Sequence, residues 1–200
     1  MNIFATTATT WPTVVGFLGS AIMFLLLGRM LATRLANRLM IMLTAVMAVA
    51  ALVTVLQPAI PPSGPALLLL GTFVLLLAVV GGGPVASLVL SLATDGTVPQ
   101  GVHGGIMIER RPSGASPQVI GRPIEVLRGG TTIGVLERLA LVAALYAGYP
   151  EAIAVIVAVK GVGRFTELDS AEARERFIIG SLASLLWAAG VAAILLLARG

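Results

Sequence analysis

The chain has 200 residues, of which 58% are hydrophobic and 11% are charged, and its mean hydropathy is +1.01. Soluble globular domains are roughly 45–50% apolar and about 25% charged, so this composition excludes an ordinary soluble protein and indicates that lipid surrounds most of the chain. The net charge of +4 lies along the edges of apolar segments, which argues against a nucleic-acid partner, and the absence of cysteine excludes disulfides, thiolate metal sites and cysteine nucleophiles.

Three apolar stretches in the first part of the chain predict three transmembrane helices, at about 11–31, 39–56 and 65–82. The first is expected to remain on the mature protein, because no basic residue precedes it as in a signal peptide. Arg29, Arg34 and Arg38 cluster around the connection between the first two stretches. This basic loop is predicted to lie in the cytoplasm, which places the N-terminus outside.

The sequence GGGP at 81–84 interrupts the third stretch. Apolar residues from Val85 to Leu92 then recur at helical spacing opposite small hydroxyl residues, which predicts a short helix lying along the membrane surface. The alternative is that the third span continues past a kink. A phosphate-binding loop is not favoured, because the pattern GxxxxGK[ST] and a preceding strand are both missing.

Residues 95–130 form the only sizeable polar segment and are expected on the cytoplasmic side. The runs GGIMIERR and QVIGRPIEVLRGG, separated by PSGASP, predict a small β-hairpin or sheet. Four arginines of this segment are candidates for binding lipid headgroups or a protein partner: Arg110, Arg111, Arg122 and Arg128. His103 is the only histidine and has no neighbouring metal ligands in the sequence, so no metal site is predicted.

Residues 131–165 predict a helical hairpin that turns at Gly148-Tyr149-Pro150, with Thr131 or Thr132 capping its first helix. Glu137 precedes the turn by about as many residues as Lys160 follows it, so the two charges are expected at the same depth. They form a candidate intramembrane charge cluster together with Arg138 and Arg164. Because a charge at the bilayer centre costs about 2.5–3.5 kcal/mol, such groups are either paired or used. The sequence leaves open whether Glu137 and Lys160 pin the hairpin or form a site for a proton, an ion, a partner or a lipid.

A sixth span is predicted at about 177–198, after the charged interfacial turn DSAEARERF. Small residues recur in it every four positions, at Gly180, Ser184, Ala188 and Ala192. Such a stripe lets helix backbones approach closely, either against the hairpin of the same chain or in a dimer. The predicted fold is an all-α integral membrane protein with about six spans and both termini outside. It is divided into a transmembrane unit (1–94), a cytoplasmic segment (95–130) and a second transmembrane unit (131–200).

Three motifs in the last third of the chain carry a resemblance. They are ERL at 137–139, KGVGRFTEL at 160–168 and ERFIIGS at 175–181. Over residues 129–197 the chain resembles an uncharacterised family of bacterial multi-pass membrane proteins, and GGGPVASLVL and HGGIMIE are similar to segments of actinobacterial relatives. The chain is expected in a bacterial inner membrane. The resemblance groups the hairpin with the final span. It brings no activity with it.

Three classes of function are compatible with the pattern. A structural or accessory subunit that binds a partner membrane complex needs no chemistry, and it is the predicted function. A small transporter or channel using Glu137 and Lys160 is the alternative, although the first three spans supply few polar residues for a pathway. An enzyme is least favoured, because HExxH, GxSxG and paired membrane aspartates are missing. The expected partners are the bilayer, anionic headgroups and a membrane protein, and no cofactor is expected.

Overall fold

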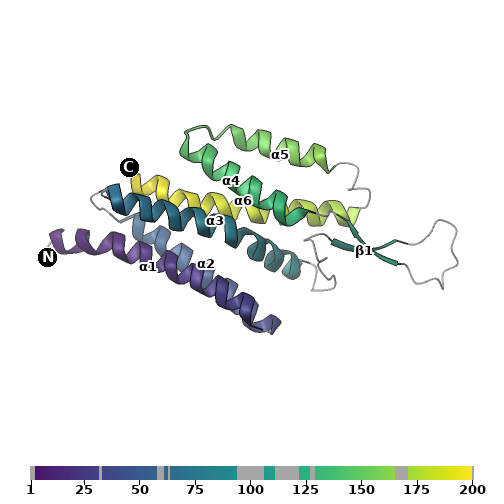
Figure 1. Ribbon diagram of the computed structural model, residues 1–200, viewed down its shortest axis with the longest axis horizontal. Helices are drawn as coiled ribbons and strands as arrows, with labels where there is room; N and C mark the ends of the chain where they lie inside the picture. Colours follow the sequence, from purple (N-terminus) through teal and green to yellow (C-terminus); the bar gives the residue numbers. More distant parts are fainter. Residues whose placement is uncertain are drawn as a thin grey trace.

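The structure is a computed structural model, and it describes residues 3–31, 33–57, 61–62, 64–93, 106–110, 122–126, 129–164 and 171–199. Most of this part of the chain is helical (Figure 1). The helices are α1 (Ile3–Met30), α2 (Arg34–Val55), α3 (Gly64–Ala93), α4 (Gly130–Tyr146), α5 (Ala152–Gly163) and α6 (Ala171–Arg199). Two strands, β1 (Ile106–Arg110) and β2 (Arg122–Val126), pair antiparallel and fall within the two runs that the sequence predicts as strands.

Four of the described helices are long and apolar enough to cross a membrane, by length and composition. They supply the stretches Thr10–Met30, Arg34–Val55, Gly64–Ala93 and Ala173–Arg199. These have 21 to 30 residues, or about 31–45 Å at 1.5 Å per residue, against a hydrocarbon core of about 30 Å. Helices α4 and α5 have only 17 and 12 residues, about 26 and 18 Å. Length therefore accounts for four of the six predicted spans.

Helix α3 runs unbroken through GGGP, with Pro84 inside it. The continued third span is thus the correct alternative, and no separate surface helix begins at Val85. Gly81 and Gly82 allow close contact with neighbouring helices and do not break α3. A Cβ atom on Gly81 would lie 2.6 Å from Trp187 Nε1, and one on Gly82 would lie 2.4 Å from Arg138 Cδ. These two glycines are what allow α6 and Arg138 of α4 to come so close to α3.

The turn between α4 and α5 is a Schellman motif. Gly148 has a φ of 77°, the left-handed conformation that glycine adopts readily, Tyr149 N donates to Ala144 O at 2.9 Å, and Gly148 N donates to Leu145 O at 3.2 Å. At the other end of α4 the predicted threonine cap is wrong. The N-cap is Gly129, with a φ of 81° and no side-chain hydrogen bond, because the left-handed backbone there brings the chain into the helix.

The helices pack in two main contacts, α1 against α2 and α3 against α6, with α4 covering the α3/α6 pair (Figure 1). Trp187 of α6 donates its Nε1 hydrogen to Leu77 O of α3 at 3.1 Å, and Thr44 of α2 donates to Ala21 O of α1 at 3.2 Å. The start of α1 and the end of α6 lie at the same end of the bundle (Figure 1). The opposite end of the bundle holds the end of α1 and the starts of α2, α4 and α6 (Figure 1).

Candidate functional site

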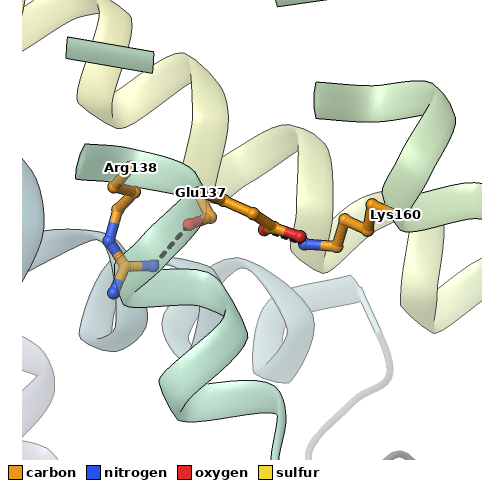
Figure 2. Close-up of polar contacts among 4 residues, drawn as sticks. Glu137, Arg138 and Lys160 are labelled. Carbon is orange, nitrogen blue, oxygen red and sulfur yellow. Dashed lines mark hydrogen bonds and ion pairs between the residues drawn. The ribbon is translucent and has the colours of Figure 1, made fainter. Parts of the chain in front are cut away.

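The pair formed by Glu137 and Lys160 joins the two helices of the hairpin. Lys160 Nζ donates to Glu137 Oε2, as Figure 2 shows, and only 15% and 8% of the two side chains are exposed. Lys160 Nζ also lies 5.7 Å from the centre of the Phe177 ring on α6. The equal spacing of the two residues from the Schellman turn is what brings them to the same level. The second oxygen, Glu137 Oε1, is buried and has no hydrogen-bond partner in the described part of the chain.

Arg138 points away from this pair and reaches two other helices (Figure 2). Its Nε donates to Val79 O of α3, and its Nη1 donates to the Ser184 hydroxyl of α6, both at 2.8 Å. Gly82 and Gly134 leave room for the guanidinium, since a Cβ on either would lie within 3.1 Å of it or its stem. Arg138 is 5% exposed and bonded to neutral acceptors, so it fastens α4 to α3 and α6 without a carboxylate on its own donors.

A cavity of about 760 Å³ lies beside these groups and is lined by residues from all six helices. Five cationic side chains line it: Arg29, Arg138, Lys160, Arg164 and Arg176. Among the described residues no carboxylate lines it. Four of the five cations are buried or nearly so, and Arg29 is exposed. We refer to this space as the cationic cavity.

The start of α4 adds a second feature that favours negative charge. Gly130 and Thr131 line the cationic cavity at the first turn of the helix, where Gly129 offers no side-chain cap. The first backbone N–H groups of a helix have no acceptor within the helix, and they carry the positive end of its dipole. Cationic side chains and uncapped amides thus converge on one space.

The structure brings together most of the predicted charge cluster and adds residues that the sequence did not predict. The candidate cluster of Glu137, Arg138, Lys160 and Arg164 is brought together, although Arg138 does not join the ion pair. Arg164 caps the end of α5 and lines the cationic cavity. Sequence reasoning missed Arg29 and Arg176 as site residues, because it assigned them to orientation and to an interfacial turn. Their shared position at the predicted cytoplasmic ends of helices was the available signal.

Three of the four residues of the small-residue stripe are buried, and Gly180 is partly buried. Ser184 holds Arg138, Ala188 is fully buried, and a Cβ on Gly180 would lie 3.1 Å from Leu90 Cδ1 of α3. The stripe therefore packs mainly against α3, with α4 reaching it through Arg138. Of the candidate headgroup-binding arginines, Arg110 of β1 and Arg122 of β2 are partners in the register of the strand pair. Arg111, Arg128 and His103 lie outside the described residues.

In the part of the chain that the structure describes, no group of three or more His, Cys, Asp and Glu residues could hold a metal ion. Comparison of the chain with protein-family models, with curated proteins and with solved structures finds no match.

Proposed function

We propose that the protein is an accessory integral membrane protein that binds an anionic ligand in the cationic cavity. The observation that carries the proposal is the convergence of five cationic side chains from α1, α4, α5 and α6 on a space of about 760 Å³ that no described carboxylate lines. Cations buried in a bundle of apolar helices are costly unless a counter-charge accompanies them. The hydrogen bonds of buried Arg138 to described residues go to neutral acceptors, and an anionic ligand supplies a negative charge beside it.

The transporter alternative has less support. The hydroxyl groups of α1, α2 and α3 that a polar pathway would need are bonded to carbonyls of their own helices: Ser20 to Gly16 O, Thr54 to Ala50 O and Thr72 to Leu68 O, at 2.7–2.8 Å. Glu137 and Lys160 likewise bond to each other. These contacts favour a protein that holds its ligand at one end of the bundle over one that passes it through.

The anion site can be tested by thermal unfolding in detergent. Two anionic probes, inorganic phosphate and dihexanoyl phosphatidic acid, are each compared with chloride at equal ionic strength. We expect at least one of them to raise the melting temperature, because a ligand that binds only the folded state stabilises it. Arg29→Gln, which removes a lining cation, should reduce the shift, and Arg34→Gln, an exposed arginine outside the lining, should leave it intact. Absence of a shift with both probes, or equal shifts in both variants, would overturn the proposal.

We also propose six crossings, in a bacterial inner membrane, with both termini outside. The short hairpin is expected to reach the outer surface, since the Arg199 guanidinium lies 5.4 Å from the centre of the Tyr146 ring and so links the end of α4 to the last turn of α6. A short span is accommodated by local thinning of the bilayer. A hairpin returns to the side from which it entered, so the positions of the termini do not depend on how deeply it reaches.

Single cysteines in this cysteine-free chain test the orientation. A membrane-impermeant maleimide applied to intact cells should label Glu151→Cys in the exposed turn between α4 and α5. It should label Arg34→Cys, at the start of α2, only after the cells are permeabilised. Labelling of Arg34→Cys from outside would reverse the orientation. Labelling of Glu151→Cys only after permeabilisation would show that the hairpin does not reach the outer surface.

A further inference from the structure

The cationic cavity combines its charges with apolar walls. Leu25 and Ile41 line it from the α1/α2 side, and Val79, Val80 and Leu90 line it from α3. Leu25 and Ile41 are 2% and 4% exposed, so this wall is part of the packed interior. Such apolar walls do not stabilise a small hydrated anion, because they cannot replace the water around the ion.

The volume is also larger than a phosphate group requires. A phosphate occupies roughly the volume of three water molecules at about 30 Å³ each, a small fraction of the 760 Å³ of the cavity. The remaining space accommodates a larger organic portion. Pockets of about 300–1,000 Å³ with mostly apolar walls and a few placed polar groups are typical of organic ligands.

The exposed residues that line the cavity include apolar side chains. Leu31 at the end of α1 and Ile133 in the first turn of α4 both line the cavity, and they are 43% and 36% exposed. Beside them lie exposed Arg29 and Thr131. Exposed lining residues of both apolar and cationic character suit the boundary between lipid tails and headgroups, where long basic side chains carry their charge toward water.

The depth of the cavity agrees with this boundary. Its α3 lining extends from Val79 to Leu90, about 22–39 Å from the start of that helix at Gly64. If α3 enters at the outer face of a hydrocarbon core of about 30 Å, as the proposed orientation has it, the cavity straddles the inner face of the core. Lipid phosphates of the cytoplasmic leaflet lie at this level.

We infer that the cationic cavity binds the phosphate headgroup of a lipid of the cytoplasmic leaflet, with the hydrocarbon chain leaving past Leu31 and Ile133. The inference rests on the proposed anion-binding function and names the class of its ligand. Arg29, Arg138 and Lys160 offer donors to the phosphate, with the amides at the start of α4, and Leu25, Ile41 and Leu90 contact the first carbons of the chain. Arg164 and Arg176 line the same space while also having interactions within the protein.

Three probes separate the headgroup from the chain. Dihexanoyl phosphatidic acid carries both parts, glycerol 3-phosphate carries the phosphate without chains, and dihexanoyl phosphatidylcholine carries the same chains with a zwitterionic head. The binding of each is measured on the full chain in detergent by the shift in melting temperature. We expect phosphatidic acid to bind at least tenfold more tightly than glycerol 3-phosphate, and phosphatidylcholine to produce no shift.

A filling variant provides a second, structural test. A Cβ on Gly83 meets no atom within 4 Å, and Gly83 lines the cationic cavity, so Gly83→Leu should fold and occupy part of the space. It should weaken phosphatidic acid binding by at least tenfold, whereas Gly16→Leu on α1, where a Cβ also meets nothing within 4 Å and which does not line the cavity, should have little effect.

The outcomes are distinct. Equal binding of glycerol 3-phosphate and phosphatidic acid would leave the anion site and overturn the lipid inference. Equal binding of phosphatidylcholine and phosphatidic acid would overturn both, because the charge would not matter. No shift with any of the three probes would overturn the inference. If inorganic phosphate is also without effect, the proposed function is overturned with it.

Discussion

Replacing Lys160 by methionine should lower the free energy of unfolding by about 3–5 kcal/mol, as is typical when one partner of a buried ion pair is lost. Glu137 would remain 8% exposed, with neither carboxylate oxygen bonded within the described residues. Glu137→Leu should be at least as costly, because it leaves Lys160 in a space already lined by four arginines. Reversible unfolding in mixed detergent micelles measures both effects.

The double variant Glu137→Leu with Lys160→Met decides what the pair is for. An apolar pair of similar volume is often as stable as the ion pair it replaces, so the double change should recover most of the loss. Glu151→Gln in the exposed turn is the matched control and should leave the stability nearly unchanged. Single variants as stable as the parent would contradict a structural pair and make the unbonded Glu137 oxygen the place to look for a bound proton.

Three neighbouring glycines of α3 should respond in opposite directions to substitution by alanine. Gly81→Ala and Gly82→Ala should each destabilise the protein by about 1–3 kcal/mol, because the new methyl groups collide with Trp187 and Arg138 at 2.6 and 2.4 Å. Gly82→Ala also displaces Arg138 from Val79 O and Ser184. Gly83→Ala should stabilise it by about 0.5–1 kcal/mol, since it meets nothing and removes a flexible residue from a helix.

The same unfolding measurement compares all three glycine variants, and Gly83→Ala serves as the internal control for helix propensity. The close approach of α6 and Arg138 to α3 predicts that alanine lowers the free energy of unfolding at Gly82 and raises it at the adjacent Gly83. If all three substitutions stabilise the protein, the glycines do not provide that approach, and the triplet has another role.

The sequence alone determined the features that depend on local chain geometry. Its composition gives the apolar helices, and Gly148 with Pro150 gives the turn, because each follows from neighbouring residues. The sequence also determines that Glu137 and Lys160 lie at the same level, because the helical rise and the position of the turn set the depth of both residues. The positive-inside rule also predicts that the basic residues gather toward one end of the bundle.

Only the tertiary structure decided which helices are neighbours and what their polar groups meet. Hydropathy has no information about lateral order, so nothing in the sequence assigned GGGP to contacts with Trp187 and Arg138, or turned Arg138 away from the ion pair. The sequence likewise shows basic residues at helix ends, but it does not predict that Arg29 and Arg176 line one cavity with Arg138 and Lys160. The cationic cavity exists because α1, α4, α5 and α6 pack so that these ends meet, and that packing is set by contacts between residues far apart in the chain.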